Sequence, residues 1–157
     1  MRSIIIIIIG IFMSGWIWRI YNSSINNTIS YSPDYAVAIN FITYRNATMK
    51  YIYYNKDAID IVIPQAMLSE YLPVPWSMHA RHTWNARISN GIVYVWGNAT
   101  PRQIFLVRKL LRQSLAVGEA QGGILQPAGE ALPAFVPEGS LVSATGSNRY
   151  RPDNEHY

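Results

Sequence analysis

The sequence predicts an α+β protein, in which an N-terminal transmembrane helix is followed by a small domain of two helices packed on a mainly antiparallel sheet. Three observations predict this architecture. Residues 3–20 are almost entirely apolar, two later segments repeat apolar residues at helical spacing, and several short β-rich runs include an Asn-Gly turn. The expected order is anchor, helix, strand, hairpin, helix, strand, strand, which favours an α+β fold.

The N-terminal segment predicts a membrane anchor. No charge interrupts it between Ser3 and Arg19. At 1.5 Å per helical residue, residues 3–20 nearly cross a hydrocarbon layer of about 30 Å. Trp16 and Trp18 fit the boundary of a bilayer, where aromatic residues gather.

A secretory signal peptide is the alternative interpretation of this segment. A cut after Ser14 or Gly15 would place Phe12 or Met13 three residues before the scissile bond, where the peptidase needs a small side chain. We therefore predict an uncleaved anchor, with a removed signal left as the alternative. Arg2 and the terminal amine favour a cytoplasmic N-terminus, which places the C-terminal domain on the other side of the membrane.

Length and composition indicate a single domain beyond the anchor. Residues 21–31 are polar and predict a juxtamembrane linker, or else a continuation of the anchor helix. Residues 32–144 are enough for one core, and the polar residues 145–157 predict a disordered tail. The 157-residue chain has no cysteine, which excludes disulfides and thiolate chemistry. Its net charge of +4 is too mild to favour a nucleic-acid binder.

The first helix of the domain has a clear start. Ser32 is the expected N-cap, Pro33 the first helical residue and Asp34 the acid of the first turn, and the helix is expected to end near residue 54. A short strand at residues 59–63 should follow, stopped by a proline. The predicted buried stripe is Tyr35, Ala38, Ile39, Ile42, Met49, Ile52 and Tyr53, and Asn40, Arg45 and Lys50 are expected to point elsewhere.

A β-hairpin is the strongest local signal in the middle of the chain. Residues 82–89 and 92–96 are β-rich and flank Asn90-Gly91, the preferred pair for a two-residue type I′ turn. The proline-rich residues before it, 64–81, leave room for a single helical turn at 65–71.

The second helix starts with a capping box. Thr100, Pro101 and Gln103 provide the cap, the first helical residue and the reciprocal side chain, and Gly118 is the expected stop. Glycines around residues 118–123 should form its C-cap and a turn, before strands at 124–126 and 140–144. The expected buried side is Ile104, Val107, Leu111 and Leu115, with Phe105 and Leu110 beside it.

No residue pattern indicates catalysis, a metal or a cofactor. The G-x-S-x-G motif is missing, and Asp57 and Asp60 at a helix end suit solubility better than acid–base chemistry. His79 and His82 have only Glu70 nearby as a further ligand, so they predict hydrogen-bonding loop residues.

The most distinctive charge feature is a set of four cations without an acid on the second helix. These candidate docking residues are Arg102, Arg108, Lys109 and Arg112. They could meet lipid head groups or an acidic partner, or they could form a solvated helix face.

Several short patterns resemble the PilM family. They are residues 36–47 (AVAINFITYRNA), 91–96 (GIVYVW), 117–118 (VG), 123–127 (GILQP) and 136–142 (VPEGSLV). The family comprises small inner-membrane proteins of type IVb thin-pilus clusters on conjugative plasmids and enterobacterial islands. The resemblance implies a non-catalytic part of the pilin transport apparatus or pilus basal body. Its partners would be other pilus biogenesis proteins, with no nucleic acid or small-molecule substrate.

Two other functions stay open at this point. A minor pilin or pseudopilin would enter the fibre, although a prepilin cut after Gly10 would put Gly15 where pilins usually carry Glu. A membrane-tethered periplasmic hydrolase is the alternative from another class.

Overall fold

The computed structural model describes residues 32–74 and 83–147. Contacts divide the chain into two units, Met1–Ala36 and Val37–Tyr157, and the described part of the first unit is the opening of one helix. In the parts of the chain that are described, no helix is long and apolar enough to cross a membrane. The predicted anchor at 3–20 and linker at 21–31 lie outside the described residues, so both stay predictions.

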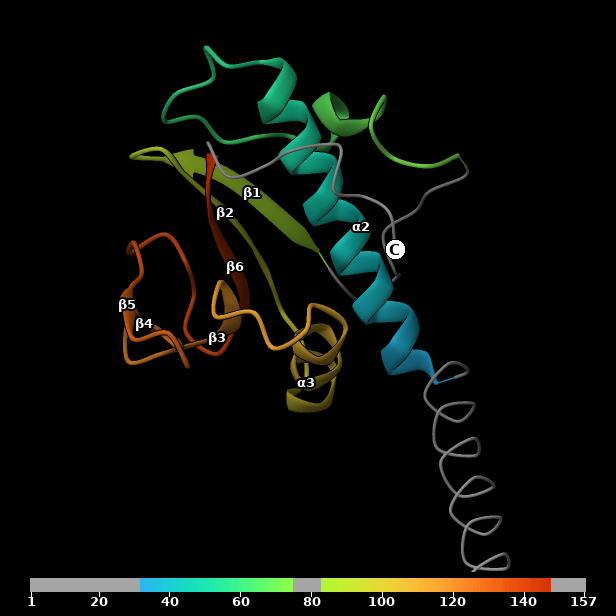
Figure 1. Ribbon diagram of the computed structural model, residues 1–157, viewed down its shortest axis with the longest axis vertical. Helices are drawn as coiled ribbons and strands as arrows, with labels where there is room; N and C mark the ends of the chain where they lie inside the picture. Colours follow the sequence, from blue (N-terminus) through green and yellow to red (C-terminus); the bar gives the residue numbers. More distant parts are fainter. Residues whose placement is uncertain (1–31, 75–82, 148–157) are drawn as a thin grey trace, which may run out of the picture. The chain divides into compact units, whose positions relative to one another are not determined.

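The second unit is a small α+β domain with a six-stranded antiparallel sheet, as the sequence predicts (Figure 1). The strands run in the order β1-β2-β6-β3-β4-β5. The elements are α2 (Pro33–Tyr54), a one-turn 3-10 helix (Gln65–Leu68), β1 (Trp84–Ser89), β2 (Ile92–Gly97), α3 (Pro101–Leu110), β3 (Val117–Gln121), β4 (Ile124–Gln126), β5 (Glu130–Ala131) and β6 (Leu141–Gly146).

The hairpin is confirmed. Asn90 and Gly91 have φ of 51° and 71°, and this positive pair is what a type I′ turn needs. β1 and β2 pair antiparallel from Trp84 opposite Gly97 to Ser89 opposite Ile92. The other side of β2 pairs with β6, so the last strand of the described residues lies within the sheet, between β2 and β3.

One face of the sheet packs against α2. The ring of Phe41 meets that of Trp84 edge-on, with centroids 5.1 Å apart. Trp84 Nε1 donates a hydrogen bond to Asn40 Oδ1 at 2.7 Å. Arg45 Nε donates to Ser143 Oγ on β6 at 2.8 Å. The predicted stripe on this helix is therefore partly wrong, because residues expected to point away from the core contact the sheet.

The buried face of α2 is only partly apolar. Ile39 is 41% exposed, whereas Tyr44 and Thr48 are buried. The hydroxyl of Thr48 donates to the Tyr44 carbonyl at 2.9 Å, which satisfies it within the helix. The buried residues of α2 are Val37, Ala38, Phe41, Tyr44, Ala47, Thr48, Met49 and Ile52. The sequence correctly predicts that Ala38, Met49 and Ile52 are buried. It wrongly predicts burial for Tyr53, which is 36% exposed.

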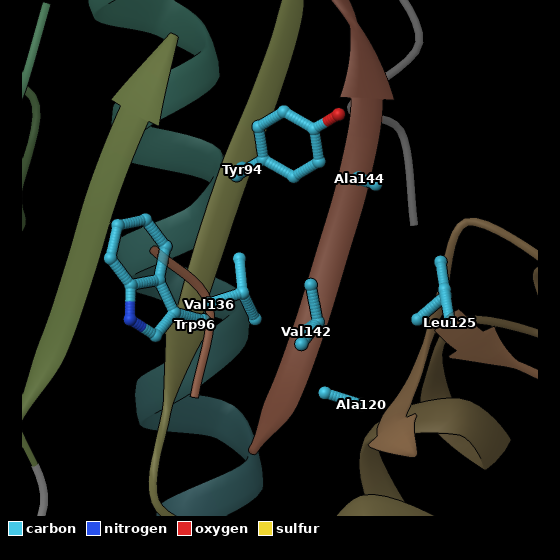
Figure 2. Packing of buried hydrophobic residues seen from close by; sticks show 7 residues of the cluster. All are labelled: Tyr94, Trp96, Ala120, Leu125, Val136, Val142 and Ala144. Atoms are coloured by element: carbon cyan, nitrogen blue, oxygen red, sulfur yellow. The ribbon is translucent and has the colours of Figure 1, made fainter. Parts of the chain in front are cut away.

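The opposite face of the sheet has a separate apolar cluster (Figure 2). Its members are Tyr94, Trp96, Ala120, Leu125, Val136, Val142 and Ala144. Phe135, from the irregular segment before β6, lies against Tyr94 and Trp96 with ring centroids 5.6 and 5.3 Å away. The guanidinium of Arg87 stacks on the ring of Phe135, 4.6 Å from its centroid. A loop therefore closes this half of the core.

Two expectations about the sheet need correction. The strand expected at 59–63 is a single bridge between Val62 and Arg87, because Pro64 cannot donate to the ladder and the pairing stops there. Thr145 and Gly146, which were expected in the tail, belong to β6. Residues 148–157 lie outside the described part of the chain.

Candidate docking surface

The start of α3 is fixed by the predicted capping box. Gln103 N donates to Thr100 Oγ1 at 3.3 Å, and Thr100 N donates to Gln103 Oε1 at 2.9 Å. Pro101 occupies the first turn, where its missing N–H costs nothing. These bonds satisfy two backbone donors that a helix start leaves unpaired, so α3 begins at a defined residue.

One side of α3 is buried in the domain. Its buried residues are Gln103, Ile104, Leu106 and Val107. Phe105 was expected beside this side, yet it is 57% exposed. Leu115, also expected to be buried, is 63% exposed.

The helix ends eight residues before the predicted stop at Gly118. Its last residue is Leu110, and Arg112 and Gln113 follow with φ of 53° and 59°, which are left-handed conformations that a helix cannot continue through. Gly118 belongs instead to β3, where a Cβ atom would overlap the backbone oxygen of Gln126 on β4. The glycine is needed there for close strand pairing.

The four candidate docking residues lie on α3 and directly after it. Arg102, Lys109 and Arg112 are exposed, and Arg108 is half-buried. Arg108 Nε is buried and has no hydrogen-bond partner within the described structure. The charge of Arg108 is therefore partly withdrawn from the surface, whereas Arg102, Lys109 and Arg112 are exposed.

Phe105 is the residue that sequence reasoning missed at this site. On a helix, side chains three and four residues apart are neighbours. Phe105 is thus adjacent to Arg102 on one side and to Arg108 and Lys109 on the other. The sequence did contain a signal for the exposure of Phe105. An aromatic residue three or four positions from three cations lies on the same face of the helix as those cations. We call Arg102, Phe105, Arg108, Lys109 and Arg112 the α3 surface.

A second exposed cluster consists of tyrosines. Tyr54 stacks on Tyr71 with a centroid separation of 6.1 Å, and Tyr51 meets Tyr71 edge-on at the same separation. The ring centroids of Tyr53 and Tyr54 are 5.2 Å apart, and the side chain of Tyr54 is 64% exposed. These rings hold the end of α2 against the segment after the 3-10 helix, which gives them a structural role.

Two tyrosines in the core have raised pKa values. Burial raises the pKa of Tyr44 to about 12. The pKa of Tyr94 is also raised, by burial first and by the negative charge of Glu130 second. Both phenols belong to the packed interior on either side of the sheet, not to the α3 surface.

Two histidines are the sequence's candidates for metal ligands. His79 and His82 lie outside the described residues. Within 32–74 and 83–147, no three His, Asp or Glu side chains gather as a metal site would require. Asp57 and Asp60 are exposed, and Asp60 accepts a hydrogen bond from Asn90 N at 3.0 Å, next to the hairpin turn.

Comparison with known proteins gives one family. A family model described as PilM matches residues 9–144. Among solved structures, the chain is similar to a crystal structure of a PilM protein from Escherichia coli B7A. The two share 22% sequence identity with a TM-score of 0.49, over 73% of this chain and 96% of that chain. No curated protein matches the chain.

Proposed function

The chain belongs to the PilM family, and from that premise we propose that it is a non-catalytic inner-membrane component of a type IVb thin-pilus assembly machine. Family membership gives the pilus-related role. The finer proposal is that the protein belongs to the pilin transport apparatus or the basal body. There it would act by binding other pilus biogenesis proteins, without a cofactor.

The α3 surface is the observation that supports a docking role. Three exposed cations lie on or next to one short helix whose start is fixed by a capping box. Cations on a rigid element act together on an oppositely charged surface, so they contribute both long-range attraction and orientation. The fold itself gains little from them, because exposed charges are individually worth less than about 1 kcal/mol.

Replacing Arg102, Lys109 and Arg112 together by Gln tests the proposal. We expect pilus assembly to be lost, while the free energy of unfolding changes by less than about 1 kcal/mol. Arg108 is left unchanged because it is half-buried, and its replacement would mix a packing effect with the loss of charge.

The matched control keeps the charge. Arg102→Lys with Arg112→Lys should retain assembly if charge carries the contact. The measurement is the amount of surface pili at equal cellular levels of the protein. Normal piliation in the Gln variant would contradict the proposal and leave these residues as a solvated surface.

The proposed location is the inner membrane, with one span at residues 3–20 and the C-terminal domain in the periplasm. The apolar segment and its Arg2 flank support this topology. A reporter that is active only in the periplasm, fused after Ser147, should be active. Activity of a cytoplasm-only reporter at the same position would contradict the assignment.

A further inference from the structure

We propose that the α3 surface docks on anionic lipid head groups, with Phe105 inserted among them. The proposal keeps the assembly role but assigns the α3 surface to lipid in place of the protein partner considered above. It rests on charge, on exposed apolar side chains between the charges, and on where the chain enters the domain.

The charge around α3 has one sign over a long stretch of sequence. Between Glu70 and Glu119 the chain has no acidic residue. The same stretch contains Arg81, Arg87, Arg102, Arg108, Lys109 and Arg112. A segment of this kind is attracted to a surface of negative charge, and the attraction falls off within a Debye length of about 8–10 Å.

Exposed apolar side chains distinguish the α3 surface from a purely electrostatic one. Phe105 is 57% exposed between Arg102 and Arg108 in the sequence, and Leu110 is 36% exposed between Lys109 and Arg112. Leu115 follows at 63% exposure. Cations alternating with Phe and Leu are typical of segments that lie at the membrane–water interface, where the charges meet head groups and the apolar groups enter the acyl boundary.

A protein partner fits this alternation less well. Protein interfaces concentrate their apolar residues in a central core from which charge is depleted. Here the exposed apolar residues of α3, Phe105 and Leu110, each have cations on both sides in the sequence, so they are not gathered in a centre free of charge. Lipid head groups and acyl chains rearrange around individual side chains, and they can therefore accept such a pattern.

The predicted anchor and linker set an upper limit on how far the domain can lie from a bilayer. Within the domain, Figure 1 shows α3 toward the same end as the first turns of α2. The predicted anchor joins the chain at that end through the eleven residues 21–31. An extended linker of this length spans at most about 40 Å, so the effective concentration of lipid surface is high and a weak affinity suffices.

The absence of cysteine permits a direct test on the full-length protein. Leu115→Cys provides one labelling site for an environment-sensitive dye, and Ala131→Cys on exposed β5 provides a matched control site. The labelled proteins are reconstituted in vesicles of phosphatidylcholine, with or without phosphatidylglycerol.

We expect the dye at 115 to brighten about twofold or more, with a blue shift, only when phosphatidylglycerol is present. The dye at 131 should not respond. Raised salt should reverse the change, because it screens the attraction. Both Arg102→Gln/Lys109→Gln/Arg112→Gln and Phe105→Ala should reduce it, the first by removing charge and the second with all charges retained.

Three outcomes would overturn the proposal. They are no response at 115, an equal response in neutral vesicles, and an unchanged response in both variants. A response to soluble polyglutamate, without one to phosphatidylglycerol, would assign the surface to an acidic protein. The lipid proposal and the assembly proposal can fail independently. If the Gln variant loses pili but the wild-type protein does not dock on lipid, only the lipid proposal is contradicted. If the wild-type protein docks on lipid but the Gln variant has normal pili, only the assembly role of the α3 surface is contradicted.

Discussion

Helices α2 and α3 both contain arginines, but the two helices use them in opposite ways. On α2, Arg45 points to the sheet and donates to Ser143 Oγ, Thr145 Oγ1 and the side chain of Asn46. On α3, Arg102 and Lys109 are exposed, next to an exposed Phe105. A charged residue on a helix therefore does not by itself mark the solvent face of that helix. Arg45 on α2 helps to hold the helix on the sheet, whereas Arg102 and Lys109 on α3 lie exposed at the surface.

The largest expected effect concerns Tyr44, the buried phenol of α2. Its folded-state pKa of about 12 lies above the value of about 10 for an unfolded chain, so folding favours the neutral phenol. The contribution of Tyr44 to the free energy of unfolding is fully present below about pH 10. It is lost as the pH rises from about 10 to about 12, and the loss amounts to roughly 3 kcal/mol. The raised pKa of Tyr94 acts in the same direction.

Urea unfolding of the full-length protein in mild detergent, followed between about pH 9 and about pH 11.5, measures this effect. Tyr44→Phe should make the curve flatter and leave only the part due to Tyr94. An equally steep loss of stability in Tyr44→Phe would contradict the assignment. The α3 surface contains no tyrosine, so its Gln variants should keep the alkaline slope of the wild-type protein.

A smaller effect separates the two arginines directly. Arg45→Met should lower the free energy of unfolding by about 1–2 kcal/mol, because hydrogen bonds from a charged group are lost at a half-buried position. Arg112→Gln should change it by no more than about 0.5 kcal/mol, since the residue is exposed. The denaturation midpoints of the two variants measure this difference. Equal losses in the free energy of unfolding would contradict the distinction between α2 and α3.

Elements with local signals could be predicted from the sequence. The Asn90-Gly91 turn and the Thr100 capping box each depend on residues within four positions of one another, and both are present as expected. The start of α2 is similar, because Tyr35 N donates to Ser32 Oγ at 3.2 Å. Such signals do not require any knowledge of the rest of the fold.

Elements that depend on distant pairing could not be predicted in the same way. Apolar spacing continues past Leu110 to Leu115, so the sequence favours a longer helix than the structure has. The competing signal is the pairing of β3 with β6, which lies more than twenty residues further along the chain. Tertiary pairing therefore overrides the local helical pattern at Gly118.

The candidate site was predicted in part. The four cations were identified from the sequence, and they lie on or directly after α3. Phe105 was missed because apolar periodicity assigns an aromatic residue to the core by default. The buried face of α2 was misplaced for the converse reason, since the hydroxyls of Tyr44 and Thr48 count against burial even though Thr48 satisfies its own within the helix.

The central position of β6 determines when the domain can fold during synthesis. β6 pairs with β2 on one side and with β3 on the other, yet it is synthesised after every other strand of this sheet. A nascent chain that ends before Leu141 holds two strand edges with no partner between them, so the sheet cannot close. Long-range pairing of this kind is slow, and it delays folding until translation has passed residue 146. The domain can therefore close only after residues 141–146 have been synthesised, and a product truncated before them would expose unpaired strand edges to cellular proteases and to other chains.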